Sequence, residues 1–373
     1  MKILFVIHSL LVGGSETVVT EYLTEMKALG QDVALLQMYH SETYLYRKLV
    51  EQGIPVYTVC TCQGGNSLVG KCLRRIDRRL LLRTRMNRLL RKIQPDIIHF
   101  HTNLPYMHRL SVDFTRTVYS FHTRVKRSLQ AVAGFQKAFT EACRKGMRVV
   151  AISDTIRKET LEIVPECSVT TILNGIDIAG VRRQTMDKGA LCRSLSIPED
   201  AFLMGHVGRF HPVKNHEKLI DVFREVRKRR PDAHLLLVGD GDAQRTLELK
   251  NRVERSQLTD AVHFLGIRSD AKAIMSVLDC FVLPSHAEGF PLVLGEAQAH
   301  GVRCVATAAV PEEAFINENA FALDVAETDE KWAEYILGDF VQNHGRCLDS
   351  IDLKHTVQAH LDLYEKALRG AEQ

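Results

Sequence analysis

Short apolar runs alternate with longer amphipathic runs along the whole chain, and this alternation is the strongest constraint on its fold. Runs such as KILFVIH, DIIHFH, HLLLVG and CFVLP are apolar at nearly every position, as in strands that are buried on both faces. Segments such as NHEKLIDVFREVRKR stand between them, with apolar residues at helical spacing. The pattern predicts an α/β fold in which helices cover both faces of parallel sheets.

The alternation restarts in the middle of the chain, which indicates two domains. The 373 residues exceed what one hydrophobic core usually supports. After Asn174 and Gly175, a polar stretch rich in arginine and lysine leads into a new strand near Phe202. We expect doubly wound, Rossmann-like domains over 1–175 and 176–351, with a C-terminal helix within 352–373 that packs back on the first. Two such domains facing one another leave a cleft at the carboxyl ends of their strands, where ligands bind in such sheets.

Composition narrows the class of protein. The chain is 45% hydrophobic and 25% charged, as ordinary globular proteins are, and no apolar run is long enough for a membrane helix. The start MKILFVIHSLLVGGSE lacks a small-residue cleavage site and is better explained as a buried strand with a glycine turn. Nine cysteines without a C-x-x-C pair argue against disulfides and a zinc site. We therefore expect a protein of the reducing cytoplasm.

The stretch EGFPLVLGEA carries two carboxylates on either side of a proline. Pro291 disfavours a helical conformation in the residue before it, so we expect the helix to begin at Pro291 itself. Glu288 then lies in a loop, and Glu296 lies in the second helical turn. Free backbone amides at a helix start favour an anion. The amides expected here belong to Gly289, Phe290, Leu292 and Val293.

Two strand-to-helix turns have the composition of anion sites. In GHVGRFHPVKN, Arg209 stands just past a strand and Lys214 stands at the entrance of the next helix. This pair suits a diphosphate, because arginine can fork onto two oxygens while lysine acts as a point charge. Gly13 and Gly14 precede the first helix. They either let a ligand approach the backbone closely or form a plain turn.

Possible metal ligands occur in two places, and neither predicts a metal site. His99 and His101 in IIHFHTN would direct their rings to the same side of a strand, and His122 ends another strand. No acidic or thiol ligand stands nearby to complete a zinc site, and a strand-end histidine taken alone is more often a structural hydrogen-bonding group. The acids of VGDGD could hold a divalent cation, but a turn with a helix N-cap explains them better.

Residues 71–92, KCLRRIDRRLLLRTRMNRLLRK, form a strongly basic segment. Two lysines and eight arginines stand against one aspartate, while leucine, isoleucine and methionine recur at helical spacing. Such a helix suits an anionic membrane surface, at about 1 kcal/mol for each near-surface cation. A solvated face is the default alternative, and nucleic acid is disfavoured because no aromatic stacking series accompanies the charge. Within this segment, the residues expected to contact the membrane or the acceptor are Arg74, Arg75, Arg78 and Arg79.

Taken together, these motifs resemble those of the retaining, metal-independent glycosyltransferases of the GT-B fold, specifically family 4. The resemblance covers nearly the whole chain, from Gly13 and Gly14 through FHT, ILNGID and VGRFHPVKN to EGFPLVLGEA. It implies an acceptor-binding first domain, a nucleotide-sugar-binding second domain and no metal or other cofactor. The donor is expected to be a nucleotide-diphosphate sugar, most commonly a UDP-sugar.

The resemblance also implies roles for individual residues. Glu288 would approach the hydroxyls of the transferred sugar, and Glu296 would accept hydrogen bonds from the ribose. Arg209 and Lys214 match the cations on the donor diphosphate, and His122 matches a histidine beside the sugar. The further contacts implied are Gly14, which admits the diphosphate or the acceptor, Gly208 on the donor side and His101 on the acceptor side.

The implied activity is transfer of a hexose or an N-acetylhexosamine to a saccharide acceptor with retention of configuration. The segment ATAAVPEEAF lacks the glycine-rich turn that is common after the second glutamate, and it resembles a subgroup acting in bacterial capsule or exopolysaccharide assembly. With the basic segment, this implies a lipid-linked acceptor at the inner face of the cell membrane and no nucleic acid. The alternatives are an epimerase of the same fold, a non-catalytic sugar-nucleotide-binding protein and, less favoured, a glycosidase.

Overall fold

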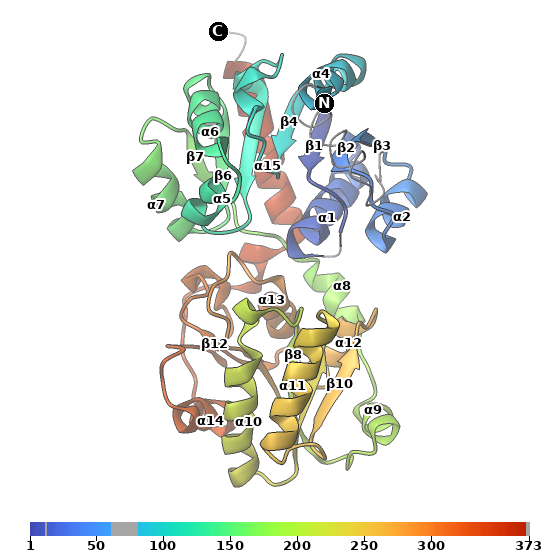
Figure 1. The fold of residues 1–373 in the computed structure, drawn as a ribbon, viewed down its shortest axis with the longest axis vertical. Coiled ribbons are helices and arrows are strands. Elements are labelled where there is room, and N and C mark those ends of the chain that lie inside the picture. The colour runs from blue at the N-terminus through green and yellow to red at the C-terminus, as the bar shows by residue number, and fades with distance from the viewer. Residues whose placement is uncertain (12, 61–80, 371–373) are drawn as a thin grey trace. The chain divides into compact units, whose positions relative to one another are not determined.

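The computed structural model describes residues 1–11, 13–60 and 81–370. The chain divides into two compact units (Figure 1). Unit 1 comprises Met1–Gly175 together with Leu353–Gln373, and unit 2 comprises Ile176–Asp352. Each unit is built on a parallel sheet with helices packed against it.

In the described part of unit 1, the sheet has seven strands in the order β3-β2-β1-β4-β5-β6-β7, and every neighbouring pair is parallel. The chain moves outward from β1 in one direction and then returns to add β4 on its other side. The carboxyl ends of β1 and β4 therefore form the switch point at which such sheets bind ligands. The strands are β1 (Lys2–Ile7), β2 (Asp32–Tyr39), β3 (Val56–Cys60), β4 (Ile97–Phe100), β5 (Thr117–Phe121), β6 (Arg148–Ala151) and β7 (Val169–Thr171).

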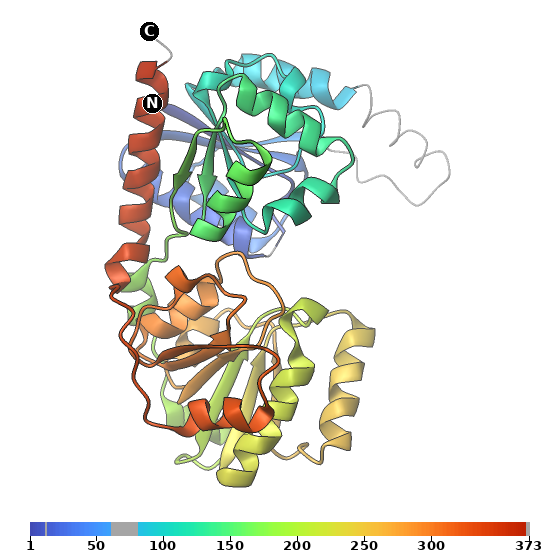
Figure 2. The same ribbon diagram turned by 90° about the vertical axis from the view of Figure 1, so that its left-hand side faces the viewer.

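The helices of unit 1 include one from the end of the chain. The described ones are α1 (Gly14–Ala28), α2 (Tyr44–Glu51), α4 (Leu82–Ile93), α5 (Val125–Ala131), α6 (Phe135–Arg144), α7 (Asp154–Ile163) and α15 (Leu353–Gly370). Figure 2 shows α15 in red alongside unit 1. Its Tyr364 hydroxyl lies 2.6 Å from Nδ1 of the buried His99 on β4. Gly175 allows α15 to approach closely, because a Cβ there would lie 2.8 Å from the Cβ of Thr356.

In the described part of unit 2, the sheet has six strands in the order β10-β9-β8-β11-β12-β13, again parallel throughout. Its switch point lies between β8 and β11, since the chain returns there to the other side of its first strand. The strands are β8 (Phe202–Val207), β9 (Ala233–Val238), β10 (Val262–Gly266), β11 (Cys280–Leu283), β12 (Arg303–Thr307) and β13 (Ala320–Leu323).

The core of unit 2 lies between this sheet and its helices. Phe223 of α10, Leu235 of β9 and Trp332 of α14 belong to one buried cluster, and none of them is exposed. Burying a large apolar side chain contributes roughly 1.5–3 kcal/mol, so this cluster holds α10 and α14 firmly on the sheet. The described α-helices are α8 (Ile178–Arg183), α9 (Lys188–Leu195), α10 (His216–Arg229), α11 (Ala243–Arg255), α12 (Ala271–Met275), α13 (Leu292–Ala299) and α14 (Asp329–Leu337).

The parallel α/β architecture predicted from the alternation of runs is confirmed. The predicted helix start at Pro291 is wrong by one residue, because α13 begins at Leu292. Pro291 is the N-cap instead, with ψ 106° in the extended region, and its carbonyl accepts a hydrogen bond from the Leu294 amide at 3.1 Å. The acid pair of VGDGD is a turn as predicted, since the Asp242 side chain caps α11 by accepting from the Arg245 amide at 2.8 Å.

The basic segment is only partly described. Its second half forms α4, in which Leu82, Met86, Leu90 and Ile93 are buried. The four arginines chosen in the first half, Arg74, Arg75, Arg78 and Arg79, lie outside the described residues. Over the described ranges, no helix has both the length and the apolar character needed to cross a membrane.

Candidate active site

The loops that follow β8 and β11 meet at the carboxyl edge of unit 2. The amide of His286 donates to the carbonyl of Val213 at 2.8 Å, which ties the two loops together. Across this junction the Lys214 ammonium pairs with the Glu288 carboxylate, with Nζ and Oε1 2.7 Å apart. The two side chains are 21% and 11% exposed, so the pair is largely withdrawn from water. Two residues that the sequence analysis selected separately are therefore in direct contact.

Local backbone conformation places Lys214. Pro212–Lys214 form a single 3-10 turn, and Asn215 then adopts a left-handed conformation with φ 54° that few residues other than glycine and asparagine tolerate. The Asn215 side chain caps α10 by accepting from the Lys218 amide at 3.4 Å. Lys214 thus stands immediately before the start of α10, where the helix dipole favours an anion.

Arg209 stands in the same loop, two positions beyond the end of β8. Its side chain is exposed, and it makes no hydrogen bond or ion pair with any described residue. Behind it, the loops after β8 and β9 touch, because Gly208 donates its amide to Val238 at 2.9 Å. A Cβ at Gly239, where φ is 138°, would overlap the carbonyl oxygen of Gly208. The exposed guanidinium of Arg209 therefore stands on a loop that packs closely against the loop after β9.

Glu296 lies in the second turn of α13, as predicted, and is buried. Its Oε1 atom lies 3.2 Å from Nζ of Lys272 on α12. Sequence reasoning missed Lys272, because no local pattern connects it with a residue on a different helix. The predicted amide donors Gly289, Phe290, Leu292 and Val293 lie around the start of α13.

The buried polar residues at or near this carboxyl edge include His206, His216 and Ser285. Nδ1 of His206 is 2.9 Å from the Val282 carbonyl. His206 Nε2, both ring nitrogens of His216 and the Ser285 hydroxyl have no hydrogen-bond partner among the described residues. Burial lowers the pKa of His206 to about 4 and that of His216 to about 2, so both rings are neutral at pH 7. Neutral rings add no positive charge next to Lys214.

The carboxyl edge of unit 1 holds the other predicted residues. Gly14 is the first residue of α1, and a Cβ there would meet nothing within 4 Å, so crowding by the described chain does not explain the glycine. The rings of His99 and His101 lie on the same side of the sheet with centroids 4.1 Å apart. His101 Nδ1 lies 2.8 Å from Nε2 of His122. Burial lowers the pKa of His122 to about 4 and that of His101 well below its usual value.

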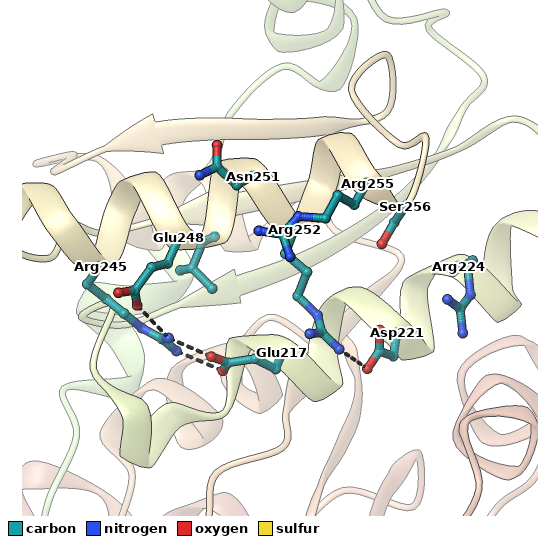
Figure 3. Close-up of a pocket in the computed structure, with 10 residues that line it drawn as sticks. Glu217, Asp221, Arg224, Arg245, Glu248, Asn251, Arg252, Arg255 and Ser256 are labelled. Carbon is teal, nitrogen blue, oxygen red and sulfur yellow. Dashed lines mark hydrogen bonds and ion pairs between the residues drawn. The ribbon is translucent and has the colours of Figure 1, made fainter.

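No three His, Cys, Asp or Glu residues in the described ranges are grouped so that they could hold a metal ion. The structure also contains a surface groove of about 440 Å³ between α10 and α11 (Figure 3). Figure 3 shows Arg245 directed at Glu217 and Glu248, and Arg252 directed at Asp221. The Arg245–Glu217 and Arg252–Asp221 pairs join α11 to α10, whereas the Arg245–Glu248 pair lies within α11. Within the described part of the chain, none of the predicted site residues lines the groove.

Comparison with known proteins places both units in one class. Residues 12–179 match Glycosyltransferase Family 4, and residues 201–338 match the Glycosyl transferases group 1. The chain is similar to a solved structure of Anabaena HepE in complex with UDP and glucose, with a TM-score of 0.76 and 20% identity over 98% of this chain and 100% of that one. The chain therefore consists of a family 4 glycosyltransferase domain followed by a domain of the glycosyl transferases group 1, and its fold is the GT-B fold.

Two curated relatives match parts of the chain. It is 33% identical over 166 residues to the putative glycosyltransferase EpsF of Bacillus subtilis, which is 44% of this chain and 42% of EpsF. It is 26% identical over 232 residues to the UDP-Gal:alpha-D-GlcNAc-diphosphoundecaprenol alpha-1,3-galactosyltransferase of Escherichia coli, over 58% of this chain and 59% of that protein. The chain thus spans less than two thirds of the length of each of these relatives.

Proposed function

We propose that this protein is a retaining glycosyltransferase that moves a hexose or an N-acetylhexosamine from a nucleotide-diphosphate sugar to a saccharide acceptor, without a metal. Its membership in the glycosyl transferases group 1 supports this proposal. The observation that carries it is the edge of unit 2, where the Lys214–Glu288 pair and the unpaired Arg209 occupy two adjoining loops. A UDP-sugar is the proposed donor, in keeping with the UDP and glucose in the structure of HepE.

The proposed role of Arg209 and Lys214 is to stabilise the leaving diphosphate. Negative charge grows on a phosphate oxygen as its bond to the sugar breaks, and positive groups already in position lower the energy of that state. In the structure, Lys214 Nζ is 2.7 Å from Glu288 Oε1. We expect the donor to divide this pair, so that phosphate oxygens contact Lys214 while sugar hydroxyls donate to Glu288. The pair orients both groups until that exchange.

The remaining donor contacts are proposed along α13. Glu296 would accept hydrogen bonds from the ribose, and Lys272, 3.2 Å away, would hold its carboxylate in place. Amides at the start of α13 would face the phosphates, where a helix N-terminus favours negative charge. In unit 1, Gly14 is proposed to let the diphosphate or the acceptor approach the backbone, and His122 is proposed to contact the transferred sugar.

The acceptor is proposed to be a lipid-linked saccharide at the inner face of the cell membrane, in the assembly of a capsule or exopolysaccharide. The name of the Escherichia coli relative includes alpha-D-GlcNAc-diphosphoundecaprenol, a lipid-linked saccharide, and this supports a lipid-linked acceptor here. The exposed residues of α4 include Arg83, Arg88, Arg91 and Lys92. Each cation near an anionic surface contributes about 1 kcal/mol, so these side chains favour peripheral binding.

Vesicle sedimentation tests the membrane proposal. We expect replacement of Arg83, Arg88 and Arg91 by glutamine to weaken binding to vesicles containing phosphatidylglycerol by roughly 100-fold at low salt. Neutral phosphatidylcholine vesicles should bind both proteins equally weakly. Unchanged binding of the triple variant to anionic vesicles would remove α4 from the proposal.

The central experiment combines ligand screening with a transfer assay. A panel of UDP- and GDP-sugars should contain one that raises the melting temperature, since a ligand at 100 times its Kd stabilises by about 2.7 kcal/mol. Glu288→Gln should lower kcat/KM for transfer about 10- to 100-fold, the effect of losing a charged hydrogen bond. Glu312→Gln, which changes an exposed acid paired with Arg346, is the control. Conversion of the donor without any acceptor would point to an epimerase, and unchanged turnover of Glu288→Gln would refute the role of that residue.

A further inference from the structure

The two histidines at the carboxyl edge of unit 1 form a hydrogen-bonded pair. His101 follows the last residue of β4, His122 follows the last residue of β5, and these parallel strands are neighbours in the sheet. Nδ1 of His101 lies 2.8 Å from Nε2 of His122, and the ring centroids are 5.1 Å apart. This separation is within the normal range for a hydrogen bond, so the rings are joined without an intervening group.

The surroundings of His101 hold it in place. Its ring packs against Phe5 of β1, with centroids 4.8 Å apart, and against His99, with centroids 4.1 Å apart. His99 is itself fixed at both nitrogens, because Nδ1 is 2.6 Å from the Tyr364 hydroxyl and Nε2 is 2.7 Å from the Ser120 hydroxyl. His101 therefore presents its Nδ1 atom to His122 from a rigid position.

A count of hydrogens links the two rings. A hydrogen bond between two ring nitrogens needs one hydrogen between them, carried either by His101 Nδ1 or by His122 Nε2. In each neutral ring, one nitrogen carries hydrogen and is a donor, and the other nitrogen is an acceptor. If His101 Nδ1 donates, His122 carries its own hydrogen on Nδ1 and is a donor there. If His122 Nε2 donates, its Nδ1 is an acceptor.

The outer nitrogens are the ones left for other groups. His101 Nε2 and His122 Nδ1 are hidden from solvent, and neither has a hydrogen-bond partner among the described residues. Burial lowers the pKa of both rings, which keeps them neutral at pH 7 and preserves the reciprocal arrangement of hydrogens. The character of His122 Nδ1 toward a hydroxyl group is therefore determined by its contact with His101.

We propose that His101 is a positioning residue, which orients the ring of His122 and selects the nitrogen of His122 that carries hydrogen. The inference rests on the proposed function in one respect, the contact of His122 with the transferred sugar. It gives His101 a role other than the acceptor contact expected from the sequence. The part of the inference that concerns the hydrogen bond itself can be tested without any substrate.

Nuclear magnetic resonance of protein labelled with ¹⁵N in its histidine rings tests the pair directly. In the wild-type chain we expect one tautomer of His122 and a nitrogen–nitrogen coupling across the bond from His101 Nδ1 to His122 Nε2. His101→Phe keeps a ring of similar shape but removes the bond, so His122 should then show a changed or mixed tautomer. Ser120→Ala, which removes a contact of His99 instead, is the matched control and should leave the signals of His122 unchanged.

Kinetics then shows whether the tautomer matters. We expect His101→Phe to lower kcat about 10- to 100-fold with little change in the KM for the donor, by analogy with residues that orient metal-bound histidines. His101→Asn, whose amide can replace Nδ1, should restore part of the loss. Reduced activity with unchanged His122 signals would mean that His101 is only structural and would overturn the inference.

The remaining outcomes separate the inference from the proposed function. If His122→Phe leaves transfer unchanged, the proposed sugar contact of His122 is wrong, while the spectra still decide whether His101 sets its tautomer. If His101→Phe fails to fold, the coupling in the wild-type chain decides alone. Absence of that coupling, or a mixture of His122 tautomers in the wild type, would refute the pair.

Discussion

The carboxyl edges of the two units lie at equivalent places in their sheets, but one holds a pair of neutral side chains and the other holds an ion pair. In unit 1 the edge holds His101 and His122, two neutral rings that share one hydrogen across 2.8 Å. In unit 2 it holds Lys214 and Glu288, two charges 2.7 Å apart. Burial explains the neutral rings, because the charged form of a histidine loses its hydration in the interior and the neutral form is therefore favoured. A charge survives at such an edge only when it is paired or partly exposed.

This difference suggests a division of labour between the units. Paired charges and an exposed guanidinium suit groups that carry or develop charge, such as a diphosphate. Neutral ring nitrogens suit hydroxyl groups, because a neutral imidazole can donate a hydrogen bond to a hydroxyl or accept one from it without burying a charge. Changes in the two units should therefore affect different kinetic quantities, and the following predictions test that separation in order of expected size.

Removal of the exposed Arg209 guanidinium should have the largest effect. We expect Arg209→Ala to lower kcat by about 10²- to 10³-fold, as loss of one group that stabilises transition-state charge does. Arg209→Lys should recover only part, because lysine cannot fork onto two oxygens. Steady-state kinetics against Arg193→Ala, an exposed arginine paired with Glu199, provides the comparison. If Arg209→Ala changed only the KM for the acceptor, the proposed role of unit 2 in stabilising the diphosphate would be wrong.

The Lys272–Glu296 pair should give the next largest effect, and it should appear in donor affinity. We expect Glu296→Gln and Lys272→Met each to weaken donor binding about 10-fold, because each leaves a buried or half-buried charge without its partner. The double variant should lose less than the sum, with a coupling of about 0.5–3 kcal/mol. Calorimetric titration with the donor measures this. The Lys188–Asp279 pair, 2.9 Å apart, is the control cycle, and equal losses in both cycles would show a merely structural contribution.

Acid should reveal the neutral histidines of unit 1 through stability, and the effect is smallest when expressed per group and per unit of pH. Burial lowers the pKa of His360 from 6.5 to about 4. The unfolded chain then binds the proton first, so stability is complete above about pH 6.5 and falls as the pH is lowered toward 4. Each such group contributes at most about 1.4 kcal/mol per pH unit. The free energy of unfolding, measured by urea titration at several pH values, should fall less steeply with decreasing pH in His360→Gln than in the wild type. An unchanged slope would contradict the assignment.

Several features of the fold follow from particular runs of sequence. The apolar runs predicted the parallel sheets, since a strand buried on both faces needs apolar residues at almost every position. The H-x-H spacing predicted that His99 and His101 share one side, and their centroids are 4.1 Å apart. The helix after Glu288 was placed within one residue. The error arose because Pro291, in an extended conformation, serves as the N-cap.

The partners of the candidate site residues could not be predicted in the same way. Nothing near Glu296 in the sequence indicates Lys272, and nothing near His99 indicates Tyr364 at the end of the chain. Such contacts join residues on different elements, so no local periodicity encodes them. The resemblance to known motifs selected Glu288 and Lys214 separately, and it did not indicate that they form an ion pair.

The sequence by itself determined the class of fold, the positions of the strand ends and the polar residues that stand there, because these depend on local patterns of apolar and polar side chains. Only the tertiary structure decided which of those residues meet and which of them are buried. The parallel order places β4 beside β5 and β8 beside β11, which brings His101 to His122 and Lys214 to Glu288. Burial at the first of these junctions lowers the pKa of both histidine rings and keeps them neutral at pH 7.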